Sequence, residues 1–332
     1  MRIDQETMTS RFKHILMQHD YSDEAATQCA DLLTKASLDG VYSHGVNRFI
    51  EFVSWIKQGV ILPKNTPKQV GGIGGLERWD GRYGSGPNNA LFAMQRAIDL
   101  SRQHGIACIG LRNTNHWMRA GNFGWQAADQ GVIGICFGNT KPNLVPWGAL
   151  EPKTGNNPMV IAIPRIKGHI VIDTSMSQFS YGKMKEYQRE GMEMPYPAGF
   201  DDSGNITHDP KIIIERELAL PIGYWKGSGL SIVLDMMATM ISNGRSTMEI
   251  GTETHETGLS QTFIAINPEA LDDWSEDKLD DMVDNIKNAK RRDENQPIYY
   301  PGEKSMMTRE ENLELGIPVD KEIWEGIKQL DA

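Results

Sequence analysis

Residues 42–48 place an arginine one helical turn after a histidine. If Ser43 caps a helix that runs to about Gln58, His44 lies in the first turn and Arg48 follows on the same face. A helix N-terminus attracts anions and disfavours an imidazolium, and an arginine offers two parallel donors to a carboxylate. The spacing therefore predicts that Arg48 holds an acid whose 2-oxo group lies near His44. A capped surface helix with an incidental histidine and arginine is the alternative.

A second polar cluster, residues 112–121, directly follows the apolar run 106–111. Polar side chains that gather at the end of a strand often form a site. Within this cluster, His116 could hydrogen-bond a substrate hydroxyl or support His44. A buried histidine that is satisfied by a loop carbonyl fits the pattern equally well.

Two further segments have features of an anion site. The apolar run 170–172 ends in Asp173 and the hydroxyl side chains of Thr174 and Ser175, which suit a ribose or pyrophosphate. Lys226 and a Gly-Ser-Gly run precede a helix expected from Leu230, so an anion could approach free N–H groups there. Each signal is weak alone, because Asp173 could be a strand-end cap and Gly-Ser-Gly an ordinary helix start.

Several catalytic and nucleotide-binding motifs are absent from the sequence. It contains no G-x-G-x-x-G, no G-x-x-x-x-G-K-[ST], no G-x-S-x-G and no paired-cysteine pattern, and His255-Glu256 only begins like H-E-x-x-H. The residue patterns therefore predict an anion-binding α/β protein with a His/Arg site and no metal.

The elements that must position these residues belong to two regions with different sequence patterns. Residues 5–38 have the periodicity of two helices, and Pro63 and Pro67 mark a linker. Beyond it, short β-rich runs alternate with Gly-, Pro- and Asn-rich loops, and helical patterns interrupt them. The runs are 106–111, 132–137, 160–163, 170–172 and 262–266, and the helical patterns are 90–104, 121–130, 230–243, 272–292 and 323–330.

This order predicts an α/β fold with a sheet packed on helices. We expect residues 1–66 and 285–332 to form a helical domain that carries His44, and residues 67–284 to form the α/β domain that binds a cofactor.

Composition limits the partners. The chain has 332 residues, of which 39% are hydrophobic and 23% charged, so it can bury a sizeable core. A net charge of -10 with dispersed lysines and arginines argues against nucleic acid. The 3 cysteines are widely spaced, which favours a reducing compartment. Residues 1–6 lack a signal-peptide core, and no apolar run approaches a membrane span. We therefore expect a cytoplasmic protein with a small-molecule partner and no membrane contact.

The same clusters resemble the type-2 malate/L-lactate dehydrogenase family over nearly the whole chain. The segments that carry the resemblance are GVYSHGVNRF (40–49), NHWMR (115–119), FGWQAA (123–128), SMSQFSYG (175–182) and GYWKGSG (223–229). Each segment is short, but together they are highly specific.

The resemblance implies an NAD(P)-binding α/β fold that is not a Rossmann fold, a homodimer with the cofactor near the subunit interface, and NADH as cofactor, with NADP possible. It implies that His44 donates the proton and Arg48 holds the substrate carboxylate, with Ser43 and His116 in the same pocket. Cofactor contacts carry over to three segments: His169, Ile170, Val171, Ile172, Asp173, Thr174 and Ser175; Trp225 and Lys226; and Gly302, Glu303 and Lys304 in the turn after Pro301.

We therefore predict that a hydride passes from the nicotinamide to the C2 carbonyl of a 2-oxo acid while His44, titrating near neutral pH, supplies the proton. A diketo sugar acid is the leading substrate, with malate, lactate, ureidoglycolate and cyclic imino acids as alternatives. The sequence departs from relatives at residues 138–143 (GNTKPN), a stretch that the resemblance places near the nicotinamide and the substrate, and at Glu303-Lys304; these departures leave the substrate and the choice between NADH and NADPH open. A metal-assisted hydrolase using His44, His116, His255 and Asp173, and an inactive nucleotide-binding module, are the alternative functions.

Overall fold

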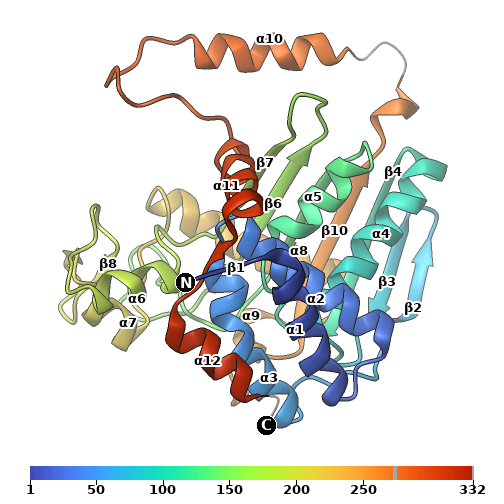
Figure 1. Cartoon of the computed structure of the whole chain (residues 1–332), viewed down its shortest axis with the longest axis horizontal. Helices are drawn as coiled ribbons and strands as arrows, with labels where there is room; N and C mark the ends of the chain where they lie inside the picture. The colour runs from blue at the N-terminus through green and yellow to red at the C-terminus, as the bar shows by residue number, and fades with distance from the viewer. Residues whose placement is uncertain (272–274, 331–332) are drawn as a thin grey trace.

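A seven-stranded sheet forms the centre of the molecule (Figure 1). The structure is a computed structural model that describes residues 1–271 and 275–330. The strands, in their order across the sheet, are β2 (Lys68–Ile73), β3 (Leu76–Asp80), β4 (Ile106–Thr114), β10 (Leu259–Ile266), β5 (Ile133–Gly138), β6 (Met159–Ile163) and β7 (Ile170–Thr174). Neighbouring strands run antiparallel except β3 and β4, which run parallel. The protein is therefore mixed α/β.

Helices cover both faces of this sheet. Phe263 and Ala265 of β10 share a core with α4 (Gly86–His104) and α5 (Gly121–Asp129). Ile264, which lies between them, packs into the core formed with α8 (Trp225–Ser242). Successive strand side chains point to opposite faces, so β10 is buried on both sides.

The two ends of the chain share another core. Helices α1 (Gln5–Gln18), α2 (Asp23–Leu38), α3 (Phe49–Lys57) and α12 (Lys321–Gln329) contribute to it, and β1 (Arg2–Ile3) pairs with β11 (Ile317–Pro318). Phe12 stacks on Phe49 with ring centroids 4.0 Å apart. Figure 1 shows the blue N-terminal helices beside the red C-terminal ones, and α11 (Glu303–Leu315) also contacts α2. This shared core fits the expected helical unit, although the domain boundaries stay a prediction.

The remaining elements surround the sheet. Between β7 and α8 the chain forms α6 (Tyr181–Arg189), β8 (Gly199–Phe200), β9 (Ile206–Thr207) and α7 (Pro210–Arg216), and after α8 it forms α9 (Thr247–Ile250), the 3-10 helix η3 (Pro268–Ala270) and α10 (Glu276–Lys287). Figure 1 shows α10 in a long segment that extends away from the sheet. Asp280 of this helix pairs with Arg165 at 2.6 Å. No helix in the part of the chain that the structure describes is long and apolar enough to cross a bilayer.

The sequence predictions hold for the strands and fail at several helix boundaries. Each of the five β-rich runs is confirmed as a strand, but β4 continues through Arg112 to Thr114. The helix expected from His44 is wrong, because two 3-10 helices, η1 (Tyr42–His44) and η2 (Val46–Arg48), precede α3. Helix α8 begins at Trp225 rather than Leu230, and Gly302 starts a helix. Of the pattern 272–292, the structure has α10, and residues 272–274 lie outside the described residues.

Candidate active site

His44 lies at the end of a 3-10 turn that is fixed against α2. Gly45 allows this close approach, because a Cβ there would lie 2.2 Å from Ser37 Oγ. The Val46 N–H donates to the same Ser37 oxygen at 2.9 Å. Ser43 does not cap a helix, as the sequence had suggested; its Oγ hydrogen-bonds His44 Nδ1 at 2.9 Å. A hydroxyl can either donate or accept at Nδ1, so Ser43 can orient both the neutral and the charged ring.

The surroundings of His44 favour its neutral form. Burial, together with the positive charges of Arg48 and Arg119, lowers the pKa of His44 to about 4. The expectation that His44 titrates near neutral pH is therefore wrong for the site without substrate, because desolvation and two arginines penalise the imidazolium.

His116 is held as a neutral donor. Its Nδ1 accepts the Met118 N–H at 3.0 Å, so the ring proton of the neutral tautomer is on Nε2. Burial, with His44 and Arg48, holds the pKa of His116 well below its usual range. The two imidazole centroids lie 6.0 Å apart. The structure thus brings His116 beside His44, with an N–H available to an oxygen acceptor.

The segment that carries His116 is anchored from several sides. The Asn115 amide donates to the carbonyl oxygens of Val60, Tyr83 and Gly84, while its oxygen accepts from Thr257 at 2.8 Å. This network fixes the loop that follows β4, and the ring of His116 is therefore preorganised.

Arg48 ends the 3-10 helix η2, so it does not lie on the helical face that the sequence suggested. Its Nη1 pairs with Glu51 at 2.9 Å, and its guanidinium carbon lies 5.1 Å from the centre of the Trp55 ring. These contacts hold the plane of the guanidinium, and its remaining N–H groups can serve a ligand.

Two hollows meet at His44. One, which we call the cleft, has a volume of about 560 Å³ and follows β7 and the loop after it. The other, which we call the cavity, has a volume of about 440 Å³ and contains Arg48. Residues that line both are Ser43, His44, His116, Thr140, Asn156 and Ser180. The imidazole of His44 therefore faces both a long cleft and a smaller charged cavity.

Most of the residues of β7 and its end that were predicted to contact a cofactor line the cleft, namely Val171, Ile172, Asp173, Thr174 and Ser175, and so does Gly302 at the start of α11. Asp173 Oδ2 accepts the Gly121 N–H at the start of α5 at 3.0 Å, and it lies 3.7 Å from Arg119 Nε. Gly121 is needed for this approach, since a Cβ there would lie 2.5 Å from Oδ2. Burial raises the pKa of Asp173, against the effects of Arg119 and the Gly121 N–H.

The other predicted cofactor residues do not line the cleft: His169, Ile170, Trp225, Lys226, Glu303 and Lys304. His169 instead contacts Asp129 at 3.1 Å, and Glu303 pairs with Lys287. Lys304 Nζ lies 4.6 Å from the centre of the Tyr299 ring.

The anion site predicted at Lys226 does not form as expected. The backbone N–H of Lys226 bonds the Gly223 carbonyl at 3.3 Å, and that of Gly227 bonds the Ile222 carbonyl at 2.9 Å. The tight turn that precedes α8 therefore already uses these donors. The side-chain Nζ of Lys226 lies 5.8 Å from the centre of the Trp225 ring.

Sequence reasoning did not single out several residues on both sides of His44. Phe179, Ile222 and Ser305 line the cleft, and Glu217 and Glu256 line the cavity, as does Lys141 from the stretch 138–143 that the sequence did point to. The hydroxyl-rich segment 175–180 was a usable signal for the loop that holds Phe179. Glu217 and Glu256 carried no such signal, because only the tertiary fold brings them to the cavity.

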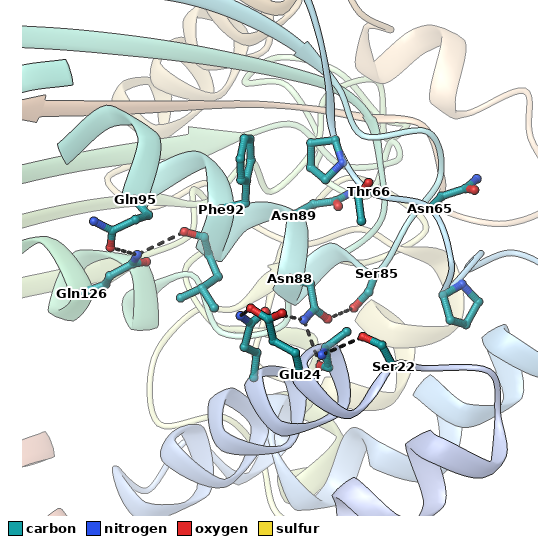
Figure 2. Close-up of a pocket in the computed structure, with 15 residues that line it drawn as sticks. Ser22, Glu24, Asn65, Thr66, Ser85, Asn88, Asn89, Phe92, Gln95 and Gln126 are labelled. Atoms are coloured by element: carbon teal, nitrogen blue, oxygen red, sulfur yellow. Dashed lines mark hydrogen bonds between the residues drawn. The ribbon is translucent and has the colours of Figure 1, made fainter. Parts of the chain in front are cut away.

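A third hollow of about 630 Å³ lies between α2 and α4 (Figure 2), and His44 is not part of its lining. Amides and hydroxyls make up much of its lining, beside apolar side chains and the single carboxylate of Glu24, which accepts from Gln28 at 3.3 Å. Ser85 Oγ donates to Asn88 at 2.6 Å, and Gln126 donates to Gln95 at 3.3 Å. Among the described residues that line this hollow there is no histidine, cysteine, lysine or arginine, so it holds nothing comparable with the histidine pair at His44.

The alternative of a metal-assisted hydrolase requires metal-binding side chains that lie close together. His44, His116 and His255 line the cavity, while Asp173 lines the cleft. Among residues 1–271 and 275–330, no group of at least 3 His, Cys, Asp or Glu is arranged to hold a metal ion.

Comparison with known proteins gives a consistent result. The sequence profile described as malate/L-lactate dehydrogenase matches residues 3–328. The chain is 42% identical over 333 residues to a 2,3-diketo-L-gulonate reductase of Haemophilus influenzae, with 99% of this chain and 100% of the relative covered. It is 43% identical to the reductase of the same name from Klebsiella pneumoniae, with the same coverage.

Solved structures of similar proteins share the fold. A malate dehydrogenase from Entamoeba histolytica superposes with a TM-score of 0.95 at 25% identity, covering 99% of this chain and 97% of that one. A sulfolactate dehydrogenase from Methanocaldococcus jannaschii gives 0.89 at 29% identity, covering 99% and 96%.

Proposed function

This chain belongs to the malate/L-lactate dehydrogenase family, and we propose that it reduces the C2 carbonyl of a 2-oxo acid with NADH, with 2,3-diketo-L-gulonate as the leading substrate. The observation that carries this proposal is the position of His44, where the cleft and the cavity meet. An acid/base in that place can reach an oxygen of a molecule in the cavity beside a second molecule in the cleft.

The cleft suits a nicotinamide dinucleotide. Hydroxyls of Thr174, Ser175 and Ser180 line it and match ribose and pyrophosphate oxygens, while Trp125 and Phe179 offer apolar surface to flat rings. The largely antiparallel sheet supports a binding mode other than the doubly wound Rossmann fold.

The charge of the cleft supports NADH over NADPH. Among the described residues that line it, Arg119 is the one lysine or arginine, and it already pairs with Asp39 and Asp173. The additional phosphate of NADPH would therefore find no unpaired guanidinium or ammonium group.

In the mechanism, the nicotinamide supplies the hydride when bound, and the chain supplies positioning and the proton. Arg48 holds the substrate carboxylate, and His116 Nε2–H donates a hydrogen bond to the carbonyl oxygen. His44 delivers the proton to that oxygen. Because Arg48 lowers the pKa of His44, a carboxylate bound to Arg48 offsets this charge and favours the protonated ring when substrate arrives. Neutral His44 is the base in the reverse direction.

The alternatives within the family are malate, lactate and ureidoglycolate. NADH oxidation measured with 2,3-diketo-L-gulonate, oxaloacetate, pyruvate and oxalurate distinguishes them. We expect the highest kcat/KM with the diketo sugar acid. The absence of turnover with every 2-oxo acid would reject the proposed activity and leave the nucleotide-binding module as the alternative.

A homodimer is part of the proposal. One face of α8 exposes apolar side chains, including Val233 at 50%, Met236 at 59% and Met240 at 74% exposure. Such a face is typical of a surface covered in an assembly, and a second copy of the chain is the occupant that the family resemblance suggests. The molar mass in solution, measured by light scattering, tests the proposed homodimer.

A cytoplasmic location is also part of the proposal, and the free cysteines fit it.

A further inference from the structure

We propose that Lys141, Glu217 and Glu256 form a hydroxyl-selective wall of the cavity, which makes the enzyme prefer 2-oxo acids with a polyhydroxylated chain over dicarboxylic and short aliphatic ones. The inference rests on the proposed function, since it concerns how the same cavity selects its substrate.

The wall is assembled from three distant segments. Lys141 follows β5, Glu217 follows α7, and Glu256 precedes β10, and all three line the cavity that contains Arg48. Lys141 Nζ pairs with Glu217 Oε1 at 2.7 Å, and the Lys141 backbone N–H donates to Glu256 Oε2 at 3.4 Å. The three residues are therefore one connected cluster.

Glu256 is the member with the most capacity left for a ligand. Its one hydrogen bond in the described structure is the long contact with Lys141, and a carboxylate can accept several. Burial raises the pKa of Glu256, while Lys141 and Arg48 oppose this increase. The influence of Arg48 places Glu256 within electrostatic reach of the group that holds the substrate carboxylate.

The charges of the cavity are mixed. Arg48 pairs with Glu51, and Lys141 pairs with Glu217. Lys185 is a further basic residue of the lining, and it is exposed. The cavity therefore offers both donors and acceptors, with Glu256 as a half-buried acceptor.

This pattern matches hydroxyl groups, because each hydroxyl both donates and accepts. A chain of hydroxyls can donate to Glu256 and Glu217 and accept from Lys141. A second carboxylate only accepts, so it would leave Glu256 without a donor and would be repelled by it. A methyl group does neither, and a site built for hydrogen bonds discriminates strongly against an analogue that lacks them.

Equilibrium binding tests the wall without depending on turnover. The probes are D-gluconate, L-malate and L-lactate, titrated by calorimetry into the protein saturated with NADH, so that no reaction proceeds. We expect the wild type to bind D-gluconate more tightly than the other two. Glu256→Gln keeps the size of the side chain, and we expect it to weaken D-gluconate binding ~10-fold or more, the scale of one charge-assisted hydrogen bond.

The same substitution should leave L-lactate unchanged and should not weaken L-malate. Glu253→Gln is the matched control, because Glu253 lies on the same segment but pairs with Arg245 and does not line the cavity. We expect this control to bind all three acids as the wild type does. Glu217→Gln gives a second variant, with a smaller loss for D-gluconate, since Lys141 then loses its partner.

An equal loss for all three acids in Glu256→Gln, or unchanged D-gluconate binding, would overturn the inference. Its failure can be separated from that of the proposed function. If the wild type reduces 2-oxo acids while its binding preference does not change in Glu256→Gln, only the hydroxyl-selective wall is wrong. If the wild type prefers D-gluconate through Glu256 but reduces no 2-oxo acid, only the proposed reaction is wrong.

Discussion

The cleft and the cavity share His44, but their walls are built differently. The cleft follows β7, an edge strand of the main sheet, and Asp173 there is fixed by the backbone of α5 and by Arg119. The far wall of the cavity comes from loop segments that hold exposed or half-buried charges, Lys141, Glu217 and Glu256. A rigid sheet edge suits a cofactor that is common to a family, whereas side chains on loops can change with the substrate.

The comparison divides the substitutions into three classes. Changes in the cleft should affect the cofactor, changes in the cavity should affect the oxo acid, and a change at the junction should affect the chemical step while leaving both affinities near normal.

His44→Ala, at the junction, should have the largest effect. We expect kcat to fall by about 10²-fold or more, because a positioned acid/base contributes on that scale. Steady-state kinetics in both directions, with NADH affinity measured separately by fluorescence, gives the comparison. A folded variant with near-normal kcat would falsify the assignment of His44.

Arg48→Lys should be the most damaging change in the cavity. An ammonium keeps the charge but cannot reproduce a planar two-point grip on a carboxylate, so we expect kcat/KM for the oxo acid to fall by roughly 10- to 100-fold. NADH affinity should not change. If NADH affinity falls by the same factor as kcat/KM for the oxo acid, the cavity and the cleft are not the separate sites described above.

Asp173→Asn should produce the opposite pattern. The amide oxygen of asparagine can still accept the Gly121 N–H, so the start of α5 keeps its cap. We expect the dissociation constant for NADH to rise about 10-fold, because a charged acceptor in the cleft becomes neutral. KM for the oxo acid at saturating NADH should stay normal, and a selective rise in that KM would place Asp173 on the substrate side.

Lys226→Ala should have the smallest effect. Lys226 is exposed and does not line the cleft, so we expect its removal to change NADH affinity by no more than about 2-fold. A loss of 10-fold or more, titrated by NADH fluorescence, would support the sequence prediction that it contacts the dinucleotide.

Local sequence patterns were enough to predict the main strands and the polar residues at their ends. The apolar, β-branched run 170–172 predicted β7, and Asp173 lies where that strand meets the cleft. Strands β2 and β3 were not predicted, because β2 is exposed along its length and contains two adjacent glycines.

The helix boundaries at the site failed for a tertiary reason. Ser43 and the periodicity after it resemble a capped helix, but Gly45 packs against Ser37 and the backbone forms two short 3-10 turns. At Lys226, a tight turn uses the N–H groups that a helix start normally leaves free. Glu217 and Glu256 could not be linked to Arg48 from sequence, since no local pattern reports contacts between segments so far apart.

The pH dependence of kcat/KM in both directions tests most directly whether His44 is a desolvated acid/base. With a pKa of about 4 in the free enzyme, His44 is neutral above pH 5. Oxidation of the 2-hydroxy acid needs the neutral base, so its kcat/KM should be constant between pH 5 and 8. Reduction needs the protonated form, so its kcat/KM should fall about tenfold for each pH unit across the same range. A kcat/KM for oxidation that instead rises with pH and levels off near pH 7 would contradict the assignment of His44 as a desolvated acid/base, because His44 would then titrate as an ordinary solvated histidine.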